Sequence, residues 1–313
     1  MSRSEHVTKR LKLQQMRVFL AVARTGSMAN AARHVGISQS VISKSIAELE
    51  VLLGVPLFDR TPLGVEPTRY GEVLLRHSVT VFDDLRTGLG EIEFMTDPNV
   101  GELRIGTTEP QTGVVAAVVK QLTRQSPGLD FKIAVADSAT LIDRQLRGRQ
   151  IDLVVAPLPE ASLVQDLDST FLYNNWLRLV VGMENRWARR RKVSLADLIN
   201  EPWCAPPADT VSGAALVNAF HASGLPLPRI IVTTAANYFH AQLTADQRFI
   251  GVSSNGPMYF DANGPAVKVL PVDLPAAYFA IVILTLKNKA ITPAARLFIE
   301  CARETTRPLA KVR

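Results

Sequence analysis

The sequence predicts an α/β protein that begins with an all-α winged helix-turn-helix, continues as a long linker helix and ends in two α/β lobes. Three observations support this fold class: the spacing of small residues in 28–47, a seven-residue apolar repeat after residue 69, and short apolar runs that alternate with helical stretches beyond residue 101. The predicted domains are 1–68 for the winged helix-turn-helix, 69–95 for the linker helix, 96–101 for a hinge and 102–313 for the two lobes.

The helix-turn-helix is indicated by residues that suit two helices joined by a tight turn. Ala32 is small enough for close packing of a second helix, and Gly36 can adopt the positive φ of the turn. Ser38 is a suitable N-cap for the second helix. Spacings of four, three and four residues then predict one buried stripe, made of Ile42, Ile46, Leu49 and Leu53.

The opposite face of this second helix is short, polar and carries one charge; it comprises Gln39, Ser40, Ser43, Lys44 and Ala47. Such a face suits a recognition helix in the major groove of DNA. An ordinary helical hairpin whose polar face meets water would show the same spacing, so the neighbouring elements decide between the two interpretations.

Both neighbours favour a DNA-binding domain. A preceding helix has an apolar face that can support the pair, formed by Leu13, Met16, Phe19, Leu20, Val22 and Ala23. Residues 57–68 predict two short extended arms around a Pro/Gly turn, which is the pattern of a wing. Arg60 on the first arm is placed to enter a minor groove.

This order of elements closely resembles the amino-terminal domain of LysR-type transcriptional regulators. The residues that carry the resemblance are Phe19, Ala23, Gly26, Ser27, Ala31, Ala32, Ser38, Gln39, Ser43, Leu49, Glu50, Leu53, Gly54, Leu57, Phe58, Arg60 and Thr68. The resemblance implies a set of residues that contact base edges, phosphates or the minor groove of DNA. These residues are Ser38, Gln39, Ser40, Ser43, Lys44, Arg60 and Thr68. Ser40 departs from the family, which most often has proline or alanine there, so base preference does not transfer from relatives.

The distribution of charge agrees with a DNA partner. Residues up to Arg76 hold eleven Lys and Arg against six Asp and Glu, which is +5 of the formal net charge of +6. Phosphate contacts require such a concentration of positive charge, and they make affinity fall with salt.

The linker helix is predicted over 69–95, a stretch without proline. Its heptad a and d positions include five apolar residues that we expect to form a dimerisation seam: Leu75, Phe82, Leu85, Leu89 and Ile92. Ser78 fills the remaining d position. The alternative is a long amphipathic helix packed on its own domain, with Gly88 and Gly90 weakening its end.

Turn-forming residues 96–101 mark the boundary to the lobes, where short apolar runs predict strands: 103–107, 131–136, 151–156, 177–182, 230–234, 249–253 and 280–286. Strands that alternate with helices favour a parallel sheet. The family resemblance implies two lobes of periplasmic-binding-protein type, with the chain crossing the hinge twice. Lobe I is expected at about 102–172 and 273–313, and lobe II at about 173–272.

A small-molecule effector is expected between the lobes, because ligands of open α/β sheets bind beyond the carboxyl ends of strands. The candidate residues are Thr107, Thr108, Glu109, Ser138, Pro206, Thr234, Asn237 and Ser253. Hydroxyl groups and helix N-termini suit a carboxylate or a sugar-like metabolite, whereas an inward-pointing Glu109 would disfavour a purely anionic one. Each residue taken singly is more often a cap or a turn residue.

The remaining reactive residues form no recognisable catalytic or metal motif. Cys204 and Cys301 are too few and too distant for one, and they suit a reducing cytoplasm. The basic run 189–192 is interpreted as a solvated loop. We therefore expect no enzymatic activity, no metal and no cofactor. With no signal-peptide core and no apolar run of transmembrane length, a cytoplasmic location without membrane contact is expected.

Together these features predict a LysR-type regulator that binds double-stranded promoter DNA as a homodimer or homotetramer under control of a small effector. Its layout is similar to the branch of the family that controls catabolism of aromatic acids and sugars. Two alternatives stay open. One is a metabolite receptor or enzyme with an appended helical oligomerisation domain, and the other is an architectural DNA protein without sequence preference.

Overall fold

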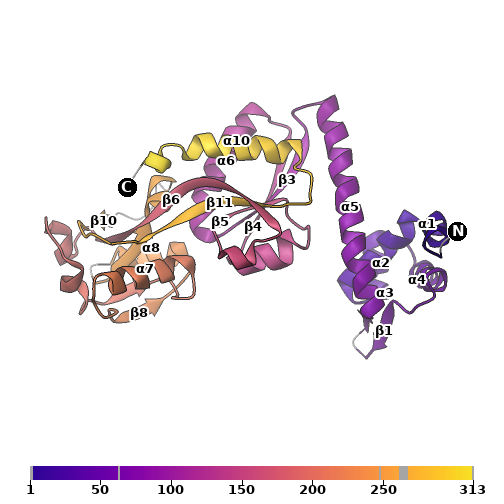
Figure 1. The fold of residues 1–313 in the computed structure, drawn as a ribbon, viewed down its shortest axis with the longest axis horizontal. Helices are drawn as coiled ribbons and strands as arrows, with labels where there is room; N and C mark the ends of the chain where they lie inside the picture. Colours follow the sequence, from indigo (N-terminus) through magenta and orange to yellow (C-terminus); the bar gives the residue numbers. More distant parts are fainter. Residues whose placement is uncertain (1–2, 63, 247, 261–266, 312–313) are drawn as a thin grey trace. The chain divides into compact units, whose positions relative to one another are not determined.

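The computed structural model describes residues 3–62, 64–246, 248–260 and 267–311. The chain folds into two compact units, one up to Gly88 and one from Leu89 onward, and each is described by itself. Figure 1 shows the helical first unit and the α/β second unit.

The first unit contains a winged helix-turn-helix. Its elements are α1 (Arg3–Arg10), α2 (Leu13–Thr25), α3 (Met28–Val35), α4 (Gln39–Leu53), β1 (Phe58–Thr61), β2 (Gly64–Pro67) and the first part of α5 (Arg69–Thr96). The helices predicted around the turn are confirmed, and so are the two arms of the wing, which pair in antiparallel fashion. Helix α1 was not expected, because its sequence is polar apart from Val7 and shows no apolar stripe.

The turn between α3 and α4 has the predicted geometry. Gly36 adopts a φ of 77°, and its N–H donates to the carbonyl oxygen of Ala32 at 2.9 Å. Ser38 caps α4 by accepting a hydrogen bond from the Val41 N–H at 3.4 Å. Ile42 and Leu49 are fully buried with Phe19 of α2, so the stripe predicted for α4 is the core of this unit.

A glycine is required where the wing meets α2. The Val65 N–H donates to the Gly26 carbonyl oxygen at 2.9 Å, which holds β2 against the end of α2. A Cβ on the neighbouring Gly64 would lie 2.2 Å from that same oxygen. Only glycine permits so close an approach of two backbones.

The predicted dimerisation seam of α5 is buried at its start and exposed at its end. Leu75 packs partly buried against the core of the first unit, and Ser78 is fully buried. Leu85, Leu89 and Ile92 are exposed by 44%, 54% and 62%. The first unit therefore covers the early turns of the seam, and the apolar stripe left in solvent lies on the later turns of α5.

The second unit is built on a mixed sheet with the strand order β4-β3-β5-β11-β6-β9-β7-β8, and β10 pairs with β6 outside this path. Its strands are β3 (Gly101–Thr107), β4 (Leu129–Val135), β5 (Leu153–Pro157), β6 (Leu167–Gly182), β7 (Trp203–Ala205), β8 (Ile230–Thr233), β9 (Ile250–Ser254), β10 (Val267–Val269) and β11 (Tyr278–Leu286). The expectation of a parallel sheet holds for β3 with β4 and β5 and for β7 with β8 and β9, but β6 and β11 run antiparallel to their neighbours.

Strand β6 passes from one lobe to the other. Its residues 167–176 pair with β11 in lobe I, and residues 177–182 pair with β9 and β10 in lobe II. The helices of lobe I are α6 (Thr112–Gln125), the π-helical η2 (Thr140–Leu146) and α10 (Pro293–Thr306); those packed on lobe II are α7 (Val211–Ala222) and α8 (Asn237–Thr244).

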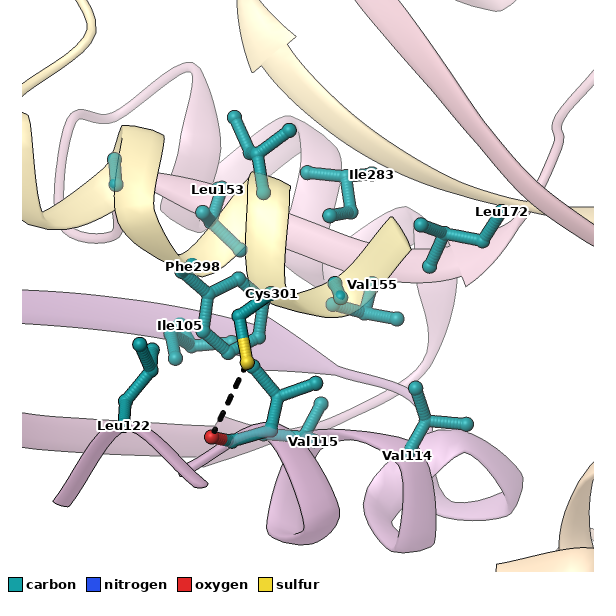
Figure 2. Packing of buried hydrophobic residues seen from close by; sticks show 14 of the residues in the cluster. Ile105, Val114, Val115, Leu122, Leu153, Val155, Leu172, Ile283, Phe298 and Cys301 are labelled. Carbon is teal, nitrogen blue, oxygen red and sulfur yellow. Dashed lines mark hydrogen bonds between the residues drawn. The ribbon is translucent and has the colours of Figure 1, made fainter. Parts of the chain in front are cut away.

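Alternation along the strands places a core on each face of the lobe I sheet. Leu153 and Val155 of β5 pack with α6 and α10, as Figure 2 shows, where Phe298 and Cys301 of α10 lie over the strands. Val154 and Ala156 point to the other face and pack with η2. Lobe II has its own core around Trp203 and Phe220.

Candidate DNA interface and effector site

The predicted recognition surface lies exposed on α4. Gln39, Ser43 and Lys44 are all exposed on this helix. Ser38 and Ser40 at its start lie with their hydroxyl oxygens 2.9 Å apart, so these two hydroxyls can hydrogen bond to each other in the free protein. The surface offers amide, hydroxyl and ammonium groups, which are the donor and acceptor types that direct base readout uses.

The other two predicted DNA contacts, Arg60 and Thr68, lie in and next to the wing. They differ in whether their side chains are already hydrogen bonded within the protein. Arg60 is exposed on β1 opposite Val65 of β2. The Thr68 hydroxyl instead donates to the Pro56 carbonyl oxygen at 2.8 Å and accepts from the Gly71 N–H at 3.1 Å. Thr68 therefore fixes the wing to the first turn of α5, a role that its sequence position does not reveal.

A groove of about 320 Å³ was not predicted. It is lined by Arg17, Leu20, Ala21, Arg24, His34, Val35 and Phe82. Its floor is apolar and its basic side chains come from α2 and α3, whose residues were interpreted above only as support for the helix-turn-helix. The available signal was a pair of basic residues two helical turns apart on one helix, Arg17 and Arg24.

In lobe I, the predicted effector residues at the end of β3 are largely engaged in local hydrogen bonds. Thr107 is fully buried, with its hydroxyl 3.2 Å from the carbonyl oxygens of Val155 and Thr108. The Thr108 hydroxyl donates to the side chain of Gln111. Ser138 is half-buried in the segment after β4. Beside it, hydrogen bonds from Thr140 lower the pKa of Asp137, which caps η2.

In lobe II, the predicted residues also lie in turns and at strand ends. Thr234 accepts from the Ala236 N–H at 3.0 Å, and Ser253 pairs through its backbone with Arg178 of β6. Pro206 is half-buried in the segment that precedes α7. These contacts match the ordinary roles of caps and turns.

Glu109 and Asn237 are predicted effector residues from different lobes that the structure joins directly. The Asn237 N–H donates to Glu109 Oε2 at 2.7 Å, and the Tyr238 N–H donates to Oε1 at 3.2 Å. Glu109 belongs to the 3-10 turn η1 (Glu109–Gln111) of lobe I, whereas Asn237 begins α8 of lobe II. The carboxylate thus bridges the two lobes.

A buried polar network beside the crossing strand was missed. Asn175 donates to the Ser254 hydroxyl at 2.9 Å and accepts from the Gly256 N–H at 3.0 Å. Asn255 accepts from the Trp176 N–H at 2.8 Å. The available signal was an asparagine pair in the middle of the strand, next to apolar residues, because buried amides require partners.

Neither thiol has the environment of a reactive cysteine. Cys204 is fully buried on β7, and burial raises the pKa of its thiol to about 11. Burial is also the main cause of the raised pKa of Cys301, whose Sγ lies 4.0 Å from the Val118 carbonyl oxygen. Figure 2 shows Cys301 among apolar side chains. Both cysteines therefore pack as small apolar residues.

His240 is a buried neutral side chain next to Cys204. Its Nε2 accepts a hydrogen bond from the Val252 N–H at 3.0 Å and lies 3.1 Å from the Cys204 carbonyl oxygen. Burial lowers the pKa of the imidazole. Since Nε2 acts as acceptor, the ring ties α8 to β9 in its unprotonated form.

Among the residues that the structure describes, no group of His, Cys, Asp or Glu is arranged to hold a metal ion. Within the same part of the chain, every helix is too short or too polar to cross a bilayer.

The comparisons with known proteins agree with this architecture. The family model of the LysR substrate binding domain matches residues 96–307, and that of the bacterial regulatory helix-turn-helix protein, lysR family, matches residues 13–72. The chain is 27% identical over 296 residues to the HTH-type transcriptional regulator GbpR of Azospirillum brasilense, covering 94% of this chain and 86% of that protein. It is 27% identical over 269 residues to PcaQ of Agrobacterium fabrum, covering 85% and 86%.

Solved structures share the fold. A full-length OxyR variant from Pseudomonas aeruginosa superposes with a TM-score of 0.72 at 17% identity, covering 97% of this chain and 99% of that one. Full-length CbnR in complex with its target DNA gives a TM-score of 0.56 at 19% identity, covering 95% and 100%.

The chain carries a winged helix-turn-helix, a long helix and a two-lobed α/β domain. This combination defines a transcriptional regulator with a DNA-binding domain and a substrate-binding domain in one chain. The chain belongs to the LysR family of transcriptional regulators, and it is a regulator rather than an enzyme.

Proposed function

We propose that this regulator binds promoter DNA through α4 and the wing and that a small metabolite between the lobes modulates that binding. The observation that carries the proposal is the exposed polar face of α4, with Gln39, Ser43 and Lys44 free to meet base edges on a fully formed helix-turn-helix. The diffuse likeness to regulators of catabolism supports a catabolic operon as the target. The site of action is then the cytoplasm, where promoter DNA lies.

We further infer that the functional unit is a homodimer, which can pair into a tetramer. The exposed apolar residues of α5, Val81, Leu85, Leu89 and Ile92, support a pairing of this helix with that of a second copy. Two recognition helices on two half-sites also give affinity that one short helix does not reach.

The effector is inferred to be a small carboxylate or sugar-like molecule. The half-buried hydroxyls at strand ends of both lobes, those of Ser138, Thr234 and Ser253, support this class. The Glu109 carboxylate favours a ligand that brings hydroxyl or amino donors. A ligand can regulate only if it binds one arrangement of the lobes more tightly than another.

The test is selection of fragmented genomic DNA by the purified full-length protein against a non-specific competitor, followed by sequencing. We expect one interrupted palindrome to be enriched, and the neighbouring genes then nominate effectors for binding assays. Uniform retention would support the architectural alternative, and no retention would support the receptor alternative.

A further inference from the structure

We propose that the Glu109 carboxylate is a clasp that holds lobe I to lobe II in the protein without effector. The inference rests on the proposed function only in treating the lobes as the regulatory part. The clasp consists of the two hydrogen bonds from the Asn237 and Tyr238 N–H groups, at 2.7 and 3.2 Å, to the two oxygens of one carboxylate.

Helix α8 depends on this clasp because its own sequence provides no cap. The helices α3, α4, α7 and α10 are capped by their own Ser27, Ser38, Thr210 and Thr292. At the corresponding position before α8 stands Ala236, which makes no side-chain cap hydrogen bond. The cap comes instead from Glu109, 128 residues earlier in the chain.

The chemistry of the contact favours a carboxylate. The first N–H groups of a helix lack partners within the helix, and its N-terminus carries partial positive charge. Hydrogen bonds from backbone N–H groups to an ionised carboxylate are stronger than those to neutral acceptors. Separation of the lobes would therefore leave the first turn of α8 uncapped.

The turn that presents Glu109 is itself held in place. The Thr112 hydroxyl donates to the Glu109 carbonyl oxygen at 2.7 Å, and Thr108 is tied to Gln111. On the other side, the Thr234 hydroxyl accepts from the Ala236 N–H, which fixes the backbone just before α8. Two positioned turns, one from each lobe, thus converge on one carboxylate, and an effector must either leave this contact intact or replace it.

Hydrogen exchange of the full-length protein tests the clasp without DNA or effector. In Glu109→Ala, we expect amide exchange in peptides covering 234–240 to rise about tenfold, because the two N–H groups lose their acceptor. Glu109→Gln keeps an acceptor oxygen of the same reach but loses the charge, so an intermediate increase is expected. Glu160→Ala, which removes an exposed lobe I carboxylate, is the matched control and should exchange as wild type in this segment.

Peptides from the lobe I core, residues 114–122, report whether a variant is folded. Wild-type exchange at 234–240 in a folded Glu109→Ala would overturn the clasp. If amide exchange in Glu109→Ala is faster at 114–122 as well, that variant is destabilised as a whole and Glu109→Gln is used instead. Wild-type exchange at 234–240 in Glu109→Gln would then overturn the proposal. A failed genomic selection with increased exchange would leave the clasp standing and reject the DNA-binding proposal, so the two failures are distinguishable.

Discussion

Gln39 and Lys44 are the residues on which the proposed base readout depends most directly. Both are exposed on α4, away from its buried stripe. We expect Gln39→Ala and Lys44→Ala each to weaken binding to the selected palindrome by about tenfold, the cost of a lost base contact. Fluorescence anisotropy at fixed salt measures this, with Glu48→Ala, an exposed change later on the same helix, as control. Unchanged affinity in both variants would remove these side chains from the interface.

His240 gives the protein a pH-dependent contribution to stability. Because burial lowers its pKa from the ordinary 6.5, the unfolded chain binds this proton more strongly than the folded one. The contribution is therefore complete above pH 6.5 and declines as pH falls below it, until the folded protein also takes the proton. The physical cause of this pH dependence is that the titratable ring is buried against β9.

As pH falls below 6.5, we expect the thermal midpoint of wild type to fall more steeply than that of His240→Gln, because glutamine does not titrate. Scanning calorimetry of both proteins over the same buffers measures the difference, and the variant itself controls for all other titrating groups. Parallel curves would show that protonation of this ring does not matter to folding.

At the level of single residues, sequence reasoning located Glu109 and Asn237 at the ends of different strands. It could not pair them, because a contact between residues 128 positions apart depends on how the two lobes close. The same limit applies to Thr68, whose hydroxyl is occupied by Pro56 and Gly71. The sequence predicted which polar residues lie at strand ends and in the wing, but it did not predict their hydrogen-bond partners.

Among the elements, α5 shows which properties of a helix depend on local sequence and which depend on its tertiary contacts. Its length was predicted to within a residue, since no proline interrupts it and its end is marked by turn formers. Pairing of its apolar stripe with a second copy stays a prediction, because a seven-residue repeat does not say whether a stripe meets its own unit or another chain. Leu75 meets the first unit, whereas Leu85 and Ile92 remain exposed.

The exposed stripe of α5 leads to a prediction about assembly. We expect Leu85→Glu with Ile92→Glu to shift the protein toward monomers, because carboxylates would be buried in the proposed interface. Sedimentation velocity over a range of concentrations measures the shift. Arg76→Glu, which places the same carboxylate on another exposed face of the helix, should leave the assembly unchanged. A double variant that sediments as wild type would contradict pairing through this stripe.

Strand direction shows a similar limit at the element scale. Apolar runs located β3, β4, β5, β8, β9 and β11, but such runs do not encode whether neighbours are parallel. The first part of β6 and the short β7 and β10 were missed, since polar residues interrupt β6 and the others contain three residues each.

For the molecule as a whole, the uneven charge is the property with the broadest consequence. The first 76 residues carry +5 of the net +6. If a dimer neutralises about six phosphates, its affinity for the palindrome should fall by on the order of a thousandfold between about 50 and 200 mM salt. Titrations by anisotropy at several salt concentrations give the slope. A flat dependence would contradict phosphate binding through this unit, and a random duplex serves as the reference.

The position of β11 in the sheet bears on how the protein is made. This strand lies between β5 and β6, yet among the residues that the structure describes it follows every other strand in sequence. Until residues 278–286 leave the ribosome, β5 and the lobe I part of β6 lack the neighbour that joins them, although every strand of lobe II has already been made. Until β11 emerges, the nascent chain therefore carries an unpaired, apolar sheet edge, and a chaperone would protect it most in this period.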